Sequence, residues 1–237
     1  MAKLYGIGVG PGDPELMTLL AVRLIGQCGV IALPDSGKEV NAAYTIAKGA
    51  CPDMDKKELL SLSMPMTRDK KTLTESHDLA AGQVIARLER GEDVAFLTIG
   101  DPSIYSTYGY IHDRVLQRGY EAQIVPGIPS FCAVSARLNE ALTEAHQGLH
   151  IIPASYHGVE EALSLPGTRV LMKSGRSIGK IKQLVKEMDP QPEVKMVERC
   201  GMEGERVFQS LDEIDENAGY FSILVVKQKQ REALAEE

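Results

Sequence analysis

Short runs of consecutive apolar residues alternate, along the first 140 residues, with segments whose apolar residues recur every three or four positions. The first pattern is typical of strands buried on both faces, and the second is typical of amphipathic helices. The predicted strands are residues 3–9, 30–33, 93–99 and 121–125. One helix is predicted to begin near Pro14, and others are predicted at residues 41–49, 69–90, 107–118 and 129–138. Residues 51–66 show no clear period. Such alternation indicates a mostly parallel sheet with crossover helices.

The pattern changes after about residue 140. Strands are predicted at residues 149–152, 169–172 and 193–198, separated by helices, but 206–209 and 220–226 lie close together in the sequence. This spacing predicts a mixed second sheet, followed by a charged helical tail over 227–237. We therefore expect an α/β protein of two domains, 1–126 and 127–237, with a mostly parallel N-terminal sheet and a mixed C-terminal sheet.

Composition and charge narrow the class of protein. The 237 residues are 43% hydrophobic and 25% charged, as in soluble globular proteins, and no apolar run approaches the ~20 residues that span a bilayer. Residues 1–30 lack the pattern of a signal peptide, so we expect a cytoplasmic protein with no membrane partner. The net charge of −7 argues against a nucleic-acid partner. The four cysteines show no C-x-x-C spacing and are interpreted as reduced, structural thiols.

A glycine-rich turn, Gly8-Val9-Gly10-Pro11-Gly12-Asp13, follows the first predicted strand, where doubly wound proteins bind phosphate. A nicotinamide-dependent dehydrogenase is the obvious interpretation, and Asp35 after the second strand resembles the ribose-binding acid of such enzymes. The glycine spacing does not fit G-x-G-x-x-G, because Pro11 and Asp13 occupy the positions that need glycine. Pro11 also lacks an N–H donor. This alternative is disfavoured, although it stays open.

Other catalytic motifs are absent from the sequence. Gly37-Lys38 is followed by Glu39, so it does not complete a P-loop, and neither G-x-S-x-G nor H-E-x-x-H occurs. His146 and His150 are spaced as a metal pair would be on a helix, but Gly148 lies between them and a strand begins at residue 149. Surface histidines are the better interpretation, and no metal site is expected.

A second loop, Gly100-Asp101-Pro102, follows the buried strand predicted at residues 93–99. It lies at the carboxyl end of that strand, where open α/β sheets bind ligands. Gly100 allows close backbone approach, and the small hydroxyl residues that follow supply hydrogen bonds. A purely structural interpretation also fits, in which Asp101 or Ser103 caps the next helix.

Three segments taken together resemble the tetrapyrrole (corrin and porphyrin) methyltransferase family over nearly the whole chain. They are Gly8 to Thr18, Gly100-Asp101-Pro102, and Val125-Pro126-Gly127-Ile128-Pro129-Ser130-Phe131. The family implies two αβα domains with a cofactor cleft between them and folded S-adenosyl-L-methionine as cofactor. Within it, the sequence is most similar to enzymes that methylate C20 of precorrin-2 or cobalt-factor II in cobalamin (vitamin B12) biosynthesis.

Four further segments carry the resemblance to the C20 subgroup. They are Asp35-Ser36-Gly37-Lys38 with Ala43 to Ala47, Met64 to Asp69, Phe96 to Tyr108, and Leu171-Met172-Lys173. Two residues depart from the pattern: Pro129 stands where Ser or Thr is frequent, which removes a hydroxyl contact, and Leu73 lies near the position of a frequent tryptophan.

The resemblance implies a set of cofactor-binding residues distributed over both domains. Pro11 lines the cleft; Ile99, Gly100, Asp101 and Ile104 hold the methionine and sulfonium part; Pro129 and Ser130 lie beside the carboxylate or ribose; and Met172, Cys200, Gly201, Phe221, Ser222 and Ile223 hold the adenine. From the sequence alone, Met172 and Phe221 also fit core positions, and Cys200 fits an inert thiol.

The implied reaction is attack of a ring carbon on the sulfonium methyl, with S-adenosyl-L-homocysteine as product. Alignment and exclusion of water are the protein's main tasks, and no acid–base constellation is visible. Asp101 is the candidate catalytic residue, in an electrostatic or proton-handling role. An anionic tetrapyrrole needs local positive charge, which Lys38, Arg68, Lys173 and Arg176, with Lys70 and Lys71, can supply. Singly, each also fits a solvated surface charge.

Two further alternatives to C20 methylation stay open, one within the family and one outside it. The enzyme could methylate another ring position or a protein, or the chain could be a binding module without activity. The resemblance also implies a homodimer formed through the C-terminal domain.

Overall fold

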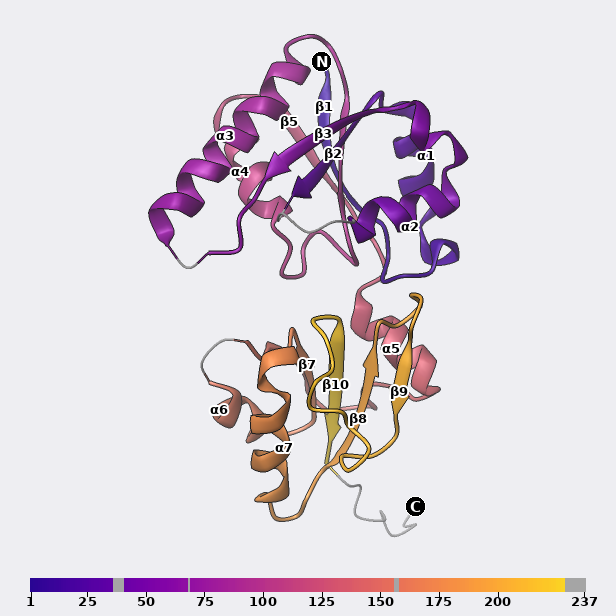
Figure 1. Cartoon of the computed structure of the whole chain (residues 1–237), viewed down its shortest axis with the longest axis vertical. Coiled ribbons are helices and arrows are strands. Elements are labelled where there is room, and N and C mark those ends of the chain that lie inside the picture. The colour runs from indigo at the N-terminus through magenta and orange to yellow at the C-terminus, as the bar shows by residue number, and fades with distance from the viewer. Residues whose placement is uncertain (36–40, 68, 156–157, 229–237) are drawn as a thin grey trace. The chain divides into compact units, whose positions relative to one another are not determined.

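A computed structural model describes residues 1–35, 41–67, 69–155 and 158–228 (Figure 1). The chain divides into two compact units, Met1–Pro129 and Ser130–Glu237, and each contains a five-stranded sheet. The division falls three residues after the predicted boundary. The roles that the family resemblance implies for the two domains, the first on the tetrapyrrole side and the second on the cofactor and dimer side, stay predictions. Among the described residues, no helix combines the length and apolar character needed to cross a membrane.

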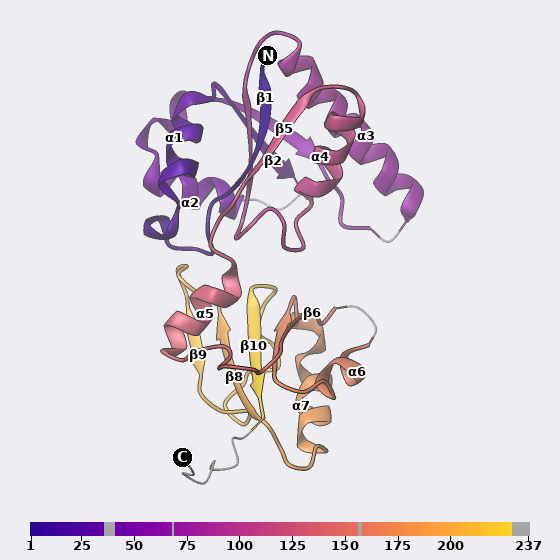
Figure 2. The ribbon, with the colours of Figure 1, turned by 180° about the vertical axis from the view of Figure 1, so that it is seen from behind.

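The first unit is built on a parallel sheet with the strand order β3-β2-β4-β1-β5. Its strands are β1 (Lys3–Gly8), β2 (Val30–Asp35), β3 (Glu58–Ser63), β4 (Val94–Thr98) and β5 (Glu121–Val125). Its helices are α1 (Leu19–Gln27), α2 (Ala42–Ala50), α3 (Lys70–Leu88) and α4 (Tyr108–Gln117), with 3₁₀ helices η1 (Pro14–Leu16) and η2 (Pro52–Lys56). Helices α3 and α4 cover one face of the sheet, and α1 and α2 cover the other (Figures 1 and 2).

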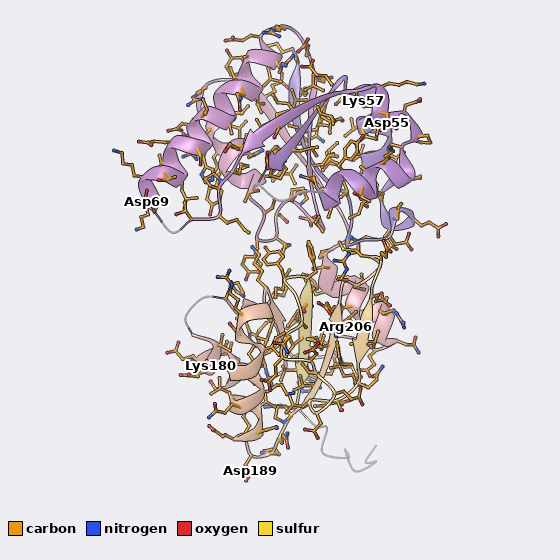
Figure 3. The ribbon with its side chains drawn as sticks, in the orientation of Figure 1. Asp55, Lys57, Asp69, Lys180, Asp189 and Arg206 are labelled. Carbon is orange, nitrogen blue, oxygen red and sulfur yellow. The ribbon has the colours of Figure 1, made fainter. Side chains whose placement is uncertain are left out.

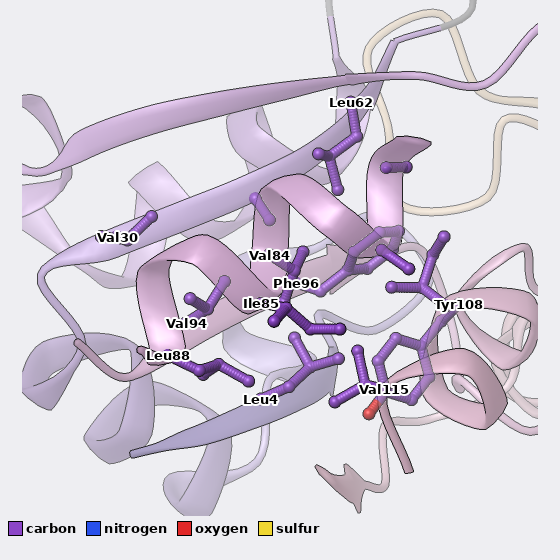
Figure 4. Packing of buried hydrophobic residues seen from close by; sticks show 14 of the residues in the cluster. Leu4, Val30, Leu62, Val84, Ile85, Leu88, Val94, Phe96, Tyr108 and Val115 are labelled. Carbon is purple, nitrogen blue, oxygen red and sulfur yellow. The ribbon is translucent and has the colours of Figure 1, made fainter. Parts of the chain in front are cut away.

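The core under α3 and α4 fixes the central strands of this sheet. Leu4, Phe96 and Tyr108 are fully buried there, together with apolar residues of α3 (Figure 4). Tyr108 fits only because residue 6 is glycine, since a Cβ at Gly6 would lie 2.1 Å from the Tyr108 ring. Its hydroxyl donates to the Gln123 carbonyl oxygen at 3.2 Å, which ties α4 to β5. The packing therefore holds β1, β4 and β5 in fixed register.

The second unit contains a mixed sheet with the strand order β6-β7-β10-β8-β9, in which only β6 and β7 pair in parallel. Its strands are β6 (Leu149–Pro153), β7 (Thr168–Met172), β8 (Glu193–Glu198), β9 (Arg206–Phe208) and β10 (Ser222–Lys227). Its helices are α5 (Ser130–Leu138), α6 (Val159–Leu163) and α7 (Ile178–Lys186), with the 3₁₀ helix η3 (Gly175–Ser177). Helices α6 and α7 lie on one face and α5 on the other (Figure 2). The predicted fold class, with a parallel first sheet and a mixed second sheet, is confirmed.

Two elements differ from the sequence-based expectation. Residues 51–66, which showed no clear period, contain η2 and the edge strand β3. Pro14 begins the short helix η1 rather than a long helix, and α1 begins at Leu19, where the Thr18 hydroxyl accepts the Ala21 N–H at 3.1 Å. Most of the predicted tail helix lies outside the described residues.

Candidate cofactor site

The loops that follow β1, β4 and β5 meet at the carboxyl edge of the first sheet. These three strands are neighbours, with Gly8 opposite Thr98 and Ile7 opposite Val125. Because the strands are parallel, the segments after them leave the sheet side by side. The sequence motifs around Gly10, Gly100 and Gly127 are thereby brought together.

Backbone contacts between these loops are close enough to exclude side chains. Gly10 and Gly100 exchange two hydrogen bonds, the Gly100 N–H to the Gly10 oxygen at 2.7 Å and the reverse at 3.3 Å. A Cβ at Gly8 would lie 2.4 Å from the Gly100 carbonyl oxygen, and one at Gly127 would lie 2.2 Å from it. Real Cβ atoms do not approach a carbonyl oxygen so closely, so Gly8 and Gly127 are required by packing.

The charges in these loops suit a cation better than a phosphate. Residues 9–13, 98–107 and 125–129 contain no Lys, Arg or His, but they contain Asp13 and Asp101. Asp13 accepts the Glu15 N–H at 2.9 Å and so caps η1, and Pro11 has no N–H to offer. A dinucleotide site would instead present free backbone donors to a pyrophosphate. The donor set at this edge therefore fits a sulfonium cofactor.

The loop after β4 carries most of the predicted contacts of the first unit. Gly100 and Asp101 are buried, and Ile99 and Ile104 are half-buried. Tyr105 is exposed and has a φ of 48°, a backbone region that costs a residue with a side chain of this size about 1 kcal/mol or more. The helix-cap alternative is not supported, because the N-cap of α4 is Thr107, whose side chain makes no capping hydrogen bond.

In the second unit, the remaining predicted residues gather at one edge of the mixed sheet. Strands β7 and β8 end there and β10 begins there, since β10 is antiparallel to both. The Arg199 N–H donates to the Phe221 oxygen at 2.9 Å, which joins the Cys200-Gly201 turn to the start of β10. Lys173 and Arg199, the first residues after β7 and β8, both have positive φ. The chain thus turns sharply at the two strand ends that carry Met172 and Cys200.

Burial separates the alternatives for these second-unit residues. Met172 and Phe221 are both half-buried and lie outside the buried core cluster of this unit, so they are not core residues in the described structure. Ser222 and Ile223 are buried, and the Ser222 hydroxyl donates to the Gly219 oxygen at 2.8 Å. Burial raises the pKa of the Cys200 thiol to about 11, so this cysteine stays protonated at neutral pH.

A charged network that the sequence analysis missed supports the same edge. Glu198, the last residue of β8, is buried and accepts hydrogen bonds at 2.6 Å from both the Arg206 Nε and the Gly219 N–H. Arg206 also pairs with Asp215 at 2.7 Å, and Figure 3 labels it on the second sheet. The network holds the segment before Phe221 against β8. The signal that could have identified this network is the burial of Glu198 at the end of a strand, and burial cannot be read from a single sequence.

The predicted substrate-binding cations are divided among the two units and the residues outside the described ranges. Lys38 and Arg68 lie outside the described residues. Lys70 and Lys71 form the first turn of α3 in the first unit, whereas Lys173 and the exposed Arg176 belong to the second unit. Burial lowers the pKa of Lys173. Their role as carboxylate contacts stays a prediction.

A cavity in the second unit lies away from the predicted cofactor-binding residues. A hollow of about 680 Å³ lies at the opposite edge of the second sheet, where β7 and β8 begin, and it is lined by Glu140, Glu193 and Lys227 among others. Its lining residues belong to no predicted cofactor contact. No group of three or more His, Cys, Asp or Glu side chains able to hold a metal ion is found over the described ranges.

Comparison with known proteins gives matches over nearly the full chain. The chain is 35% identical to "Probable cobalt-precorrin-2 C(20)-methyltransferase" of Methanocaldococcus jannaschii, over 97% of each sequence. It is 29% identical to precorrin-2 C(20)-methyltransferase of Sinorhizobium sp., over 95% of each. Uroporphyrin-III C-methyltransferase of Thermus thermophilus, solved with S-adenosylhomocysteine, shares the fold with a TM-score of 0.68 and 22% identity, over 95% of this chain and 97% of that one. Residues 3–215 match the family model for tetrapyrrole (corrin/porphyrin) methylases, and the chain belongs to this family of methyltransferases.

Proposed function

We propose that this protein is an S-adenosylmethionine-dependent methyltransferase that adds one methyl group to C20 of precorrin-2 or of its cobalt complex. The observation that carries the proposal is the full-length similarity to two relatives named for C20 methylation of these substrates. The proposal is also supported by the meeting of Gly8, Gly100 and Gly127 at the carboxyl edge of the first sheet. Methylation of another ring position or of a protein is the alternative.

The proposed cofactor contacts come from both units. Pro11 lines the site; Ile99, Gly100, Asp101 and Ile104 hold the methionine and sulfonium part; and Pro129 and Ser130 lie beside the carboxylate or ribose. The residues proposed to hold the adenine are Met172, Cys200, Gly201, Phe221, Ser222 and Ile223. When bound, the cofactor supplies a methyl group activated by its sulfonium charge. The half-buried Met172 and Phe221 offer apolar surface to a flat base, and the loops without basic residues do not repel a cation.

The chain's own part in the reaction is alignment. Rigid loops that hold both reactants in line can supply roughly 7–11 kcal/mol of the barrier, without an acid–base pair. The backbone bonds between Gly10 and Gly100 provide that rigidity. For the polycarboxylate substrate, we propose Lys38, Arg68, Lys173 and Arg176 as cationic contacts, with the arginines as bidentate clamps.

Incubation with the two candidate substrates tests the function directly. The protein is mixed with S-adenosylmethionine carrying a ¹³C-methyl group and with either precorrin-2 or its cobalt complex, under strictly anaerobic conditions. One added labelled methyl by mass spectrometry, located at C20 by NMR, is expected. Labelling of another carbon would favour a different ring position, and no labelling of either substrate would refute the proposal.

A binding assay separates the cofactor classes before any substrate is made. S-adenosylhomocysteine is expected to raise the melting temperature, whereas NAD is expected to leave it unchanged. The reverse result would favour the dehydrogenase alternative. We further propose a cytoplasmic homodimer assembled through the second unit, which sedimentation of the purified protein at several concentrations would test.

A further inference from the structure

The carboxylate of Asp101 is engaged by backbone groups of its own loop and of a second one. Asp101 lies three residues after β4 and is only 9% exposed. Its Oδ2 accepts the Gly127 N–H at 3.0 Å, and its Oδ1 accepts the Ser103 N–H at 2.8 Å. The Ser103 hydroxyl also donates to Oδ1. Both oxygens are therefore used, and three of the about four acceptor positions of a carboxylate are filled.

The bond to Gly127 joins two loops that the sequence separates by 26 residues. Gly100, the preceding residue, is bonded in turn to Gly10 in the loop after β1. The dipeptide Gly100-Asp101 thus links all three loops through hydrogen bonds among the described residues. Hydrogen bonds to a charged acceptor are about twice as strong as neutral ones, which suits a fixed support.

We propose that Asp101 is a positioning residue, whose carboxylate fixes the loop of Gly127–Pro129 against the loop of Gly100–Ile104 before the cofactor binds. This inference rests on the proposed function, because those two loops carry the proposed contacts to the methionine part. Because both of its oxygens are held by loop donors, the carboxylate cannot turn toward a substrate without breaking its bonds to the Gly127 N–H or to Ser103. The contacts therefore favour an acceptor that stays stationary.

Two substitutions at Asp101 remove its hydrogen bonds to the loops in part and in full. In Asp101→Asn the single amide oxygen can still accept the Gly127 N–H, and the Ser103 hydroxyl can rotate to accept from the amide NH₂. The Ser103 N–H then faces a donor, so this one bond is lost. Asp101→Ala loses all of them. The dissociation constant for S-adenosylhomocysteine is expected to rise about tenfold in the first variant and about 100-fold in the second. The loss is expected to fall mainly on this dissociation constant and less on turnover at saturating cofactor, because bound cofactor helps to restore the arrangement of the two loops.

Asp93→Ala is the matched control within the same unit. The Asp93 Oδ1 accepts the Lys3 N–H at 2.7 Å, a carboxylate-to-backbone bond between segments 90 residues apart at the amino end of the sheet. This variant is expected to lose stability much as Asp101→Ala does, but to bind S-adenosylhomocysteine like the wild type. A merely structural role of Asp101 would make the two alanine variants alike in affinity, and that result would overturn the proposal.

A second result would overturn it in the other direction. If Asp101→Asn lowers turnover more than 100-fold while the affinity stays unchanged, the carboxylate acts on the reacting atoms. Hydrogen exchange of the Gly127 amide gives a readout that needs no substrate: protection is expected to fall in both Asp101 variants and to persist in Asp93→Ala. A wild type that binds S-adenosylhomocysteine but leaves precorrin-2 unmethylated would refute the proposed substrate and leave the positioning role testable.

Discussion

The loops after β1, β4 and β5 pack so closely that adding one methyl group at Gly127 is expected to destabilise the protein. In Gly127→Ala the new Cβ would lie 2.2 Å from the Gly100 carbonyl oxygen and 2.8 Å from the Gly8 carbonyl carbon. Both neighbours are backbone atoms, so neither can rotate away. The φ of Gly127 is not in the left-handed region, and the cost therefore comes from the contact alone.

The magnitude follows from three contributions. Overpacking of this kind costs about 1–3 kcal/mol. A shift of Gly100 weakens its bonds to Gly10, each worth about 0.5–1.5 kcal/mol. Alanine also lowers the conformational entropy of the unfolded chain relative to glycine, which offsets about 0.4–1 kcal/mol of the destabilisation. We expect a net destabilisation of about 2–3 kcal/mol, which lowers the melting temperature by roughly 5–10 °C.

Urea denaturation followed by circular dichroism, with hydrogen exchange at Gly10 and Gly100, measures this effect. Gly82→Ala is the control, because nothing lies within 4 Å of a Cβ there and the residue is in the middle of α3. That substitution is expected to stabilise the protein by about 0.5–1 kcal/mol. If Gly127→Ala matches the control in stability and keeps the amide protection of Gly100, the argument from loop contact is refuted.

Three more predictions concern the second unit. Glu198→Gln removes the charge that faces Arg206, so the free energy of unfolding is expected to fall by about 1–3 kcal/mol. Affinity for S-adenosylhomocysteine is expected to fall as well, and calorimetry would measure both quantities. Unchanged values would contradict the inference that Glu198 supports the Gly219 segment. Because the pKa of Cys200 is about 11, its alkylation by iodoacetamide is expected to be slow at pH 8 and to rise about tenfold per pH unit up to pH 10, and a plateau near pH 8 in peptide mass spectra would refute this. Arg169 is buried and has no hydrogen-bond partner at Nε and Nη2 within the described chain. Arg169→Met is therefore expected to raise the free energy of unfolding by about 1 kcal/mol in urea titrations. A loss of about 2 kcal/mol would show instead that the buried charge is compensated.

The elements were largely predictable from the sequence because buried strands and amphipathic helices leave different periods. Strand β3 was missed for a physical reason: it lies at the edge of its sheet, and only Leu62 among its residues is buried. A strand with one buried residue leaves no run to recognise. The long helix α3 was predicted, and Gly91 indicated where it ends.

The site was predictable in its motifs and unpredictable in its contacts. The sequence places Gly10, Gly100 and Gly127 after strands, but their meeting depends on the order β4-β1-β5, which periodicity does not contain. The bond from Gly127 to Asp101 follows from the same order. Glu198 was overlooked because a charged strand end is ordinarily solvated, and its burial arises only when the 215–219 segment folds over it.

The position of β1 inside its sheet has a consequence for synthesis of the chain. Leu4 and Ile7 of β1 are fully buried, yet β1 pairs only with β4 and β5, and β4 begins at Val94. A ribosome adding about 5–20 residues per second therefore leaves β1 without a partner for about 5–20 s. During that interval an apolar strand with two open edges is exposed to other nascent chains. The strand that positions the glycine-rich turn is thus also a segment that needs protection while the protein is being made.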